Sequence, residues 1–307
     1  MQVDSEINGT VSSWVAVPEL AGRDIASLAA SNSSIFAVGS SADSLYRSTD
    51  NGKTWNPLPL AIGRFFPLVY ASNTIIAVTY PRLQISTDNG NSWNDVTNKF
   101  IGRVRKLSVN TSAVVNNIVF AGMEEDGIFT SADWGHTWTA ASNGLNSLSI
   151  YTMKEQGTKM FAGTIASIQD GVPKNGGLFV SANNGVEWTS LGPPGASVSI
   201  IAFAVHDNFL VASLLEDSSV YRSVDNGATW VRAETAQLHG CTSLAIFGEL
   251  TFAGCPGYGV FRSTDKGASW SSYTSNLPNL EISSIAISDS TIFVGTKRGV
   301  WKRKLEL

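Results

Sequence analysis

The chain has 307 residues, of which 43% are hydrophobic and 15% are charged, and its formal net charge is −4. This apolar content is enough for a large buried core, whereas the mild acidity is unlike the basic face that nucleic-acid binding requires. No stretch approaches the roughly 18 apolar residues that span a bilayer. We therefore expect a globular protein with no nucleic-acid partner and no membrane span.

The first predicted element is a strand at residues 12–17 (SSWVAV), which has the pattern of a last strand without the strands that should precede it. The first complete unit follows, with strands expected at 25–31, 35–39, 44–48 and 54–58. The last two of these strands flank the octapeptide STDNGKTW, which begins at Ser48 and ends at Trp55.

Near-copies of this octapeptide return along the chain at spacings of 38 to 50 residues. The six copies are STDNGKTW (48–55), STDNGNSW (86–93), SADWGHTW (131–138), SANNGVEW (181–188), SVDNGATW (223–230) and STDKGASW (263–270). A period of 40 to 50 residues built from short strands is typical of a β-propeller with one four-stranded blade per repeat.

The strand before each octapeptide has apolar residues on both of its faces, with Gln84 as the exception. A strand of this kind is covered on both sides, as stacked blades require. In the octapeptide, Ser and Asp side chains can bond to the backbone of a tight turn, and Asn-Gly accepts positive φ. We expect the Trp to pack on the next blade, and we interpret the whole motif as scaffolding.

After the sixth copy come three further strands, ISSIAIS (282–288), TIFVG (291–295) and GVWKR (299–303). They lack a fourth strand, whereas the segment 12–17 is a fourth strand without partners. The prediction is one all-β domain over 1–307, a seven-bladed propeller with four antiparallel strands per blade. Its ring is closed by the strand 12–17, which joins the strands of 282–303 as three plus one.

The pattern Ser-x-Asp-x-Gly-x-x-Trp resembles the Asp-box, also called the bacterial neuraminidase repeat. Proteins with this repeat include sialidases, xyloglucanase-type enzymes, sortilin-type receptors and photosystem II assembly factor propellers, so the resemblance implies a fold more than a function. The chain departs from sialidases, since it has no Arg-Ile-Pro stretch and seven expected blades instead of six. Likeness to secreted repeat proteins implies an extracytoplasmic location, reached through a signal peptide that this sequence does not show.

Two cysteines, Cys241 and Cys255, fall almost opposite one another on consecutive predicted strands. They are either small buried hydrophobes or the halves of a cross-strand disulfide.

Three arginines precede or enter the first strands of consecutive blades: Arg23, Arg64 and Arg103. First strands line the channel of a propeller, so three guanidinium groups could converge on a carboxylate, phosphate or sulfate. The alternative is that each arginine pairs locally or points to water.

Acidic residues occur in the links between second and third strands of blades three, four and five: Glu124, Glu125, Asp126, Asp170, Glu216 and Asp217. Paired carboxylates could cleave glycosides at separations of roughly 5–9.5 Å, although charged loop residues are more often solvated. The insertion at 163–177 is the longest of these loops. Equivalent links offer contact surface through Tyr80, Arg82 and Tyr258.

We find no catalytic motif in the sequence, because His136, His206 and His239 stand at unrelated blade positions and suggest no metal site or cofactor. The hypothesis is a monomeric, non-catalytic binding or assembly scaffold that takes a protein, glycan or small anion on the face opposite the boxes. The alternative is a sialidase-like or endoglucanase-like glycoside hydrolase that uses the loop carboxylates.

Overall fold

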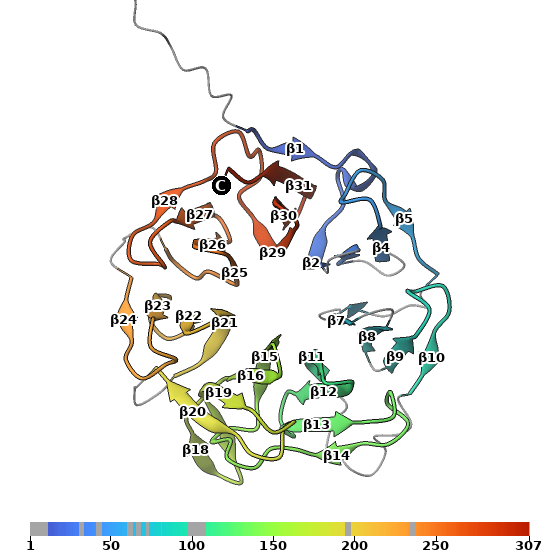
Figure 1. The fold of residues 1–307 in the computed structure, drawn as a ribbon. Coiled ribbons are helices and arrows are strands. Elements are labelled where there is room, and N and C mark those ends of the chain that lie inside the picture. Colours follow the sequence, from blue (N-terminus) through green and yellow to red (C-terminus); the bar gives the residue numbers. More distant parts are fainter. Residues whose placement is uncertain are drawn as a thin grey trace, which may run out of the picture.

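A computed structural model describes residues 12–30, 34–40, 45–59, 64–65, 69–71, 74–80, 82–96, 109–193, 198–233 and 238–306. Seven antiparallel sheets stand in a ring around a central channel (Figure 1). Each sheet is one blade of four strands, with the first strand innermost and the fourth on the rim. The prediction of an all-β, seven-bladed propeller is confirmed.

The strands of the first three blades follow the chain without interruption. Blade 1 contains β2 (Ile25–Ala30), β3 (Ile35–Gly39), β4 (Leu45–Ser48) and β5 (Asn56–Pro57). Blade 2 has its innermost strand in two described pieces, and it contains β6 (Arg64–Phe65), β7 (Val69–Ala71), β8 (Thr74–Tyr80), β9 (Arg82–Ser86) and β10 (Asn94–Asp95). Blade 3 contains β11 (Val109–Val115), β12 (Ile118–Met123), β13 (Ile128–Ser131) and β14 (Thr139–Ala140).

The remaining blades include one inserted hairpin and the two ends of the described chain. Blade 4 contains β15 (Ile150–Gln156), β16 (Lys159–Thr164), β19 (Gly177–Ser181) and β20 (Thr189–Gly192), with the hairpin β17 (Ser167–Gln169) and β18 (Val172–Lys174) between β16 and β19. Blade 5 contains β21 (Ile200–His206), β22 (Phe209–Leu214), β23 (Val220–Ser223) and β24 (Val231–Arg232). Blade 6 contains β25 (Ser243–Phe247), β26 (Leu250–Cys255), β27 (Gly259–Ser263) and β28 (Ser271–Ser272). Blade 7 contains β29 (Ile282–Ser288), β30 (Thr291–Thr296), β31 (Gly299–Lys304) and β1 (Val15–Ala16).

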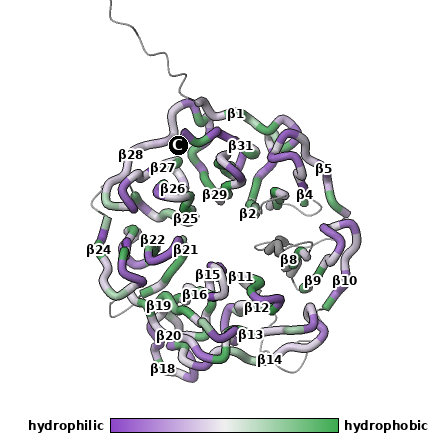
Figure 2. Tube along the Cα trace, viewed as in Figure 1, coloured by the Kyte–Doolittle hydropathy of each residue, from purple (hydrophilic) through white to green (hydrophobic). Residues whose placement is uncertain are grey.

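The core lies between neighbouring blades, where second strands are covered on both faces. All residues of β3 and of β22 are buried, and β12, β16, β26 and β30 are buried except at their first residue. The two-residue fourth strands carry exposed residues in most blades. Figure 2 shows the same gradient, with apolar segments in inner strands such as β2 and β29. Stacking of apolar blade faces therefore holds the ring together.

Each box is a turn that closes on its own side chains. In the first box, Ser48 Oγ donates to Asp50 Oδ1 (2.8 Å) and accepts the Gly52 N–H (2.8 Å). The same carboxylate accepts the Thr54 N–H at Oδ1 (2.9 Å) and the Thr54 hydroxyl at Oδ2 (2.6 Å). Four further boxes repeat this pattern around Asp88, Asp133, Asp225 and Asp265. The box side chains thus satisfy the turn, as a scaffolding role predicts.

The box Trp side chains lie on the preceding blade, so the expectation that they pack on the next blade is wrong. Trp188 of blade 4 donates its indole N–H to Ala141 O of blade 3 (2.8 Å), and Phe120 of blade 3 meets its ring edge-on. The physical reason is the glycine of the turn. Gly185 has φ +84°, and a Cβ there would lie 2.9 Å from Phe120. The turn therefore packs directly on the preceding blade, and the Trp that follows the turn packs there too.

The two ends of the described chain share the sheet of blade 7. Val15 pairs with Lys302 and Ala16 with Trp301 in an antiparallel ladder between β1 and β31 (Figure 1). Trp14 donates its indole N–H to Tyr273 O of blade 6 (3.0 Å), a contact to the preceding blade like that of the box Trp residues. β1 therefore occupies the place of a fourth strand in blade 7.

The structure joins Cys241 and Cys255 in a disulfide within blade 6. Cys241 precedes β25 and Cys255 ends β26, and both side chains are buried. Of the two alternatives that the sequence left open, the cross-strand bond is the one observed.

Candidate functional site

The two faces of the ring carry different connections. The links from first to second strands lie on the same side as the boxes, since Ile35, just after such a link, pairs with the box residue Ser48. We name this side the box face. The other side is the loop face, made by the described links 124–127, 165–176, 215–219, 256–258 and 297–298 and the blade-to-blade links 17–24, 141–149, 198–199, 238–242 and 273–281.

Backbone hydrogen bonds hold the connections of the loop face to one another. Links between second and third strands are tied to neighbouring blade-to-blade links by N–H···O bonds of 2.8–3.1 Å: Gly127 to Leu148, Ile165 to Ser149, Leu215 to Ser199, Gly240 to Ser218, Gly257 to Leu280 and Gly22 to Arg298. These links therefore form a preformed surface that a partner can bind without first ordering it.

Exposed apolar side chains gather on this face. Ten large hydrophobic residues are exposed in the part of the chain that the structure describes, and six of them lie on the loop face or at a strand end beside it: Tyr151, Ile168, Val172, Leu215, Tyr258 and Leu280. Leu215 is 56% exposed and Tyr258 is 53% exposed, and the Tyr258 ring lies 6.0 Å from that of His239. Aromatic and aliphatic groups of this kind are typical of interaction surfaces.

The longest predicted loop, 163–177, contains the two-stranded hairpin β17–β18. Asp170 and Gly171 form its two-residue turn with φ values of 50° and 77°, and Gln169 pairs with Val172. Ile168 is 75% exposed at the register position opposite Pro173. Blade 4 thus has a two-stranded ribbon added to the common plan of the blades (Figure 1), and Ile168 and Val172 are exposed on it.

The three predicted arginines are described to different extents. The Arg23 guanidinium lies over the ring of Tyr46, 4.8 Å from its centroid, and its Nε–H donates to Glu19 O (3.4 Å). Arg64 begins β6, but its side chain lies outside the described part, and Arg103 lies wholly outside the described residues. Convergence of the three on an anion stays a prediction.

The acidic candidates lie in loop-face links of blades 3, 4 and 5, as expected. Asp217 accepts the hydroxyl of Tyr221 (2.9 Å) and the N–H of Ser219 (3.0 Å), and Arg232 Nε lies 3.8 Å from it. Glu216 accepts the N–H of Ser199 (2.9 Å). Interactions also engage Glu124, Asp126 and Asp170, whereas Glu125 is exposed. Most of these carboxylates therefore support the links that carry them.

Two of the three predicted contact residues are placed by backbone alone. Tyr80 ends β8 opposite Arg64, and Arg82 begins β9 opposite Thr79. Both positions border the loop face of blade 2. Tyr258 is the one whose side chain is described, exposed beside His239.

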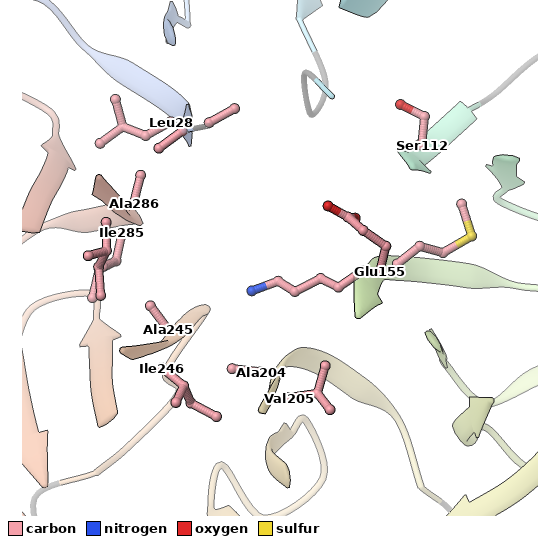
Figure 3. A pocket seen from close by; sticks show the side chains of 14 residues that line it. Leu28, Ser112, Glu155, Ala204, Val205, Ala245, Ile246, Ile285 and Ala286 are labelled. Atoms are coloured by element: carbon pink, nitrogen blue, oxygen red, sulfur yellow. The ribbon is translucent and has the colours of Figure 1, made fainter. Parts of the chain in front are cut away.

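The central channel holds a cavity of about 340 Å³ that the sequence did not point to. Its described walls come from the inner strands of six blades and are mostly Ala, Ile, Leu and Val. Two charged residues of β15, Lys154 and Glu155, and one buried hydroxyl, Ser112, interrupt this apolar wall. In Figure 3, Glu155 extends into the open centre of the channel, with Leu28, Ile285 and Ile246 on the far side.

Comparison with known proteins agrees with the box geometry. Residues 46–57 match the BNR/Asp-box repeat. The chain carries Asp-box repeats on a seven-bladed β-propeller. A probable oligoxyloglucan-reducing end-specific xyloglucanase of Neosartorya fischeri is 27% identical over 166 residues, 48% of this chain and 19% of that protein.

Solved structures of other proteins resemble the chain in fold. YCF48 bound to D1 peptide superposes with a TM-score of 0.74 at 14% identity, covering 98% of this chain and 99% of that one. The GH74 xyloglucanase of Xanthomonas campestris gives 0.69 at 14% identity, covering 96% of this chain and 54% of that one. At such identities the likeness is one of architecture, and one architecture hosts many functions.

The Asp-box carboxylates themselves are poor candidates for chemistry, since their oxygens are already bonded within the turn. Among the described residues, no group of three or more His, Cys, Asp or Glu side chains is arranged to hold a metal ion. No helix in the same part of the chain is long and apolar enough to cross a membrane.

Proposed function

We propose that the chain is a binding scaffold whose loop face takes a segment of a partner protein. The observation that carries this proposal is that exposed apolar residues share one preformed face, where Leu215, Tyr258 and Leu280 lie in links whose backbones are already hydrogen-bonded to one another. A rigid frame lowers the ordering cost of binding, and aromatic side chains supply contact area at small entropic cost.

The loop face also carries charge of both signs, which would orient a bound segment. Lys297 and Arg298 are exposed in the link between the second and third strands of blade 7. They lie near Arg23, which is in the link from blade 7 to blade 1, and acidic residues lie in the links of blades 3 to 5. We include Arg23, Arg64 and Arg103 in the proposal as the groups that would meet a carboxylate of the partner. The neighbour YCF48 was solved with a bound peptide, which makes a peptide the first ligand class to test.

The test is a peptide-display selection against the purified chain, followed by affinity measurements on the recovered peptides. A variant with Leu215→Ser, Tyr258→Ser and Leu280→Ser should lose at least about tenfold in affinity. The matched control changes Val186→Ser and Val224→Ser, which are exposed residues of boxes on the other face, and it should bind as the wild type does. Equal losses in both variants, or none in either, would refute the proposal.

Glycoside hydrolysis is the second candidate, because the probable xyloglucanase of Neosartorya fischeri matches 48% of the chain. The chain spans only 19% of that protein, so the activity of the relative is no more than a hypothesis for this chain. Release of reducing ends from xyloglucan oligosaccharides, abolished by Glu124→Gln with Asp170→Asn, would support an enzyme. Hydrolysis that survives in this variant would show that other residues catalyse it. If the wild type shows no hydrolysis, the binding scaffold is the proposal that remains.

We also propose an extracytoplasmic location. The bond between Cys241 and Cys255 supports it, since disulfides form and persist in oxidising compartments such as the periplasm or the extracellular space. Thiol labelling of the protein taken from its own cells would test this, and free thiols at both positions would contradict it.

A further inference from the structure

The seven inner strands can be compared position by position, because their pairing with the second strands fixes a common register. The residues that pair with the third residue of the second strand, or with the second residue of the shorter β3, are alanine in five blades and valine in one: Ala29, Val69, Ala113, Ala204, Ala245 and Ala286. In blade 4 the same position holds Lys154, opposite Phe161.

The next position along the strand shows the same exception. Six blades place an uncharged, mostly aliphatic residue there: Ala30, Tyr70, Val114, Val205, Ile246 and Ile287. Blade 4 places Glu155. The residue immediately before the alanine (or before Lys154 in blade 4) is apolar in blades 1, 4, 5, 6 and 7, whereas blade 3 has Ser112 there. The polar exceptions therefore come from two adjacent blades.

These positions surround the cavity of about 340 Å³ in the channel. They lie in the second half of the inner strands, so the cavity is in the half of the channel nearer the box face. Ser112 and Glu155 lie on one side of the cavity, and Leu28, Ile246 and Ile285 lie on the other (Figure 3). Lys154 is the second charged residue of the lining. A cavity of this volume is at the small end of ligand pockets, with an apolar body and few polar groups.

The charged groups of the cavity keep hydrogen-bonding capacity that the fold does not use. Lys154 Nζ reaches across blade 5 and donates to Leu244 O of blade 6 (3.0 Å), which uses one of its three N–H bonds. Glu155 is exposed to the channel. Ser112 is buried, and its Oγ has no hydrogen-bond partner in the described structure. This oxygen is shielded from the cavity, so Ser112 is part of the wall, and the groups open to a ligand are those of Lys154 and Glu155.

Charge balance selects the chemistry of a ligand. Lys154 and Glu155 bring one positive and one negative side chain to a described wall that is otherwise uncharged, so these walls carry no net charge. A simple anion or a simple cation would leave the cavity with a net charge in an apolar wall, which is unfavourable. A zwitterion keeps the balance, with its carboxylate toward Lys154 and its ammonium toward Glu155.

We propose that the box-face half of the channel binds a small zwitterion with an aliphatic body, the chemistry of a free aliphatic amino acid. Lys154 and Glu155 hold the two charged groups, and the aliphatic body lies against the walls of blades 1, 6 and 7. The site is at the opposite end of the channel from the loop face, so it is independent of the partner surface proposed above.

Isothermal titration calorimetry with leucine tests the proposal. Three further probes each lack one feature: 4-methylpentanoate has no ammonium, isopentylamine has no carboxylate, and glycine has no aliphatic body. We expect leucine to bind at one site, and each of the other three to bind at least about tenfold more weakly. Failure of leucine to bind, or equal binding of the amine or the acid, overturns the proposal.

Variants connect the binding to the channel. Lys154→Ala with Glu155→Val copies Ala204 and Val205 of blade 5, and it should abolish leucine binding. Glu155→Gln keeps the side-chain shape and should weaken binding about tenfold or more, which guards against a folding defect in the double variant. The control is Lys159→Ala with Glu187→Val, an exposed pair outside the channel with the same change in charge. Undiminished binding in the channel variants overturns the proposal. If the wild type does not bind leucine and the Lys154 and Glu155 variants are less stable than the wild type, the two residues have a packing role instead.

Discussion

At the scale of single residues, the box carboxylates make stability depend on pH. Asp225 has its pKa lowered to about 2, first by the hydroxyl of Thr229 and then by the Thr229 N–H. Because the folded pKa is below the ordinary value of 3.8, its contribution to the free energy of unfolding is complete above that pH and is lost as the pH falls toward 2. We expect Asp225→Asn to make the loss of stability in acid shallower, as measured by urea unfolding at a series of pH values.

The chain supplies its own precedent for this substitution. The fourth box has Asn183 in place of Asp, and Asn183 Oδ1 still accepts the Ser181 hydroxyl (2.9 Å) and the Glu187 N–H (3.0 Å). The five Asp boxes have Thr or Ser four residues later, whereas the Asn box has Glu. Asp207→Asn, at the exposed turn before β22, makes the same change outside the boxes and serves as the control. An acid dependence that Asp225→Asn does not alter would contradict the prediction.

At the scale of elements, the disulfide of blade 6 links the segment before β25 to the end of β26. Its cysteines are 14 residues apart, and a crosslink over such a loop is worth about 3 kcal/mol by restricting the unfolded chain. We therefore expect Cys241→Ala with Cys255→Ala to lower the free energy of unfolding by roughly 2–4 kcal/mol. Denaturant unfolding with and without a reducing agent measures this, since the reductant should destabilise the wild type and leave the variant unaffected. A wild type indifferent to the reductant would show that the bond is absent in solution.

The elements that the sequence predicts best are those with a strong local signal. The third strands are found where apolar pairs precede the boxes, as at β4 and β27. The hairpin β17–β18 was missed because its strands are short, exposed and interrupted by Pro173, although Asp170-Gly171 is a two-residue hairpin signal. The prediction that the Trp side chains pack on the next blade is wrong because their direction depends on the packing of Gly185 on Phe120. That packing is a contact between two blades, which no local sequence pattern encodes.

At the scale of the whole molecule, the ring itself determines where a site can be. The repeats predict the number of blades and the two faces, but the loop residues vary without a pattern that reveals contacts. Lys154 and Glu155 lie in an ordinary-looking strand, IYTMKEQ, and become exceptional only when the seven inner strands are placed in register. β-Bulges near the start of β2, β11, β15, β21 and β29 shift that register, so strand alignment by sequence alone is one residue uncertain.

Ring closure is a property of the whole molecule and can be tested at Trp14. This side chain is buried, meets Tyr273 edge-on at 5.9 Å and belongs to the core between blades 6 and 7. Trp14→Ala should lower the free energy of unfolding by about 3–5 kcal/mol, as large core truncations do. Val15→Ala on the same strand is the control, because Val15 is exposed, and it should cost little. Circular dichroism and tryptophan fluorescence should report one shared unfolding transition in both variants, since every blade is stabilised by its two neighbours. A Trp14→Ala protein as stable as the wild type would show that β1 does not hold the ring together.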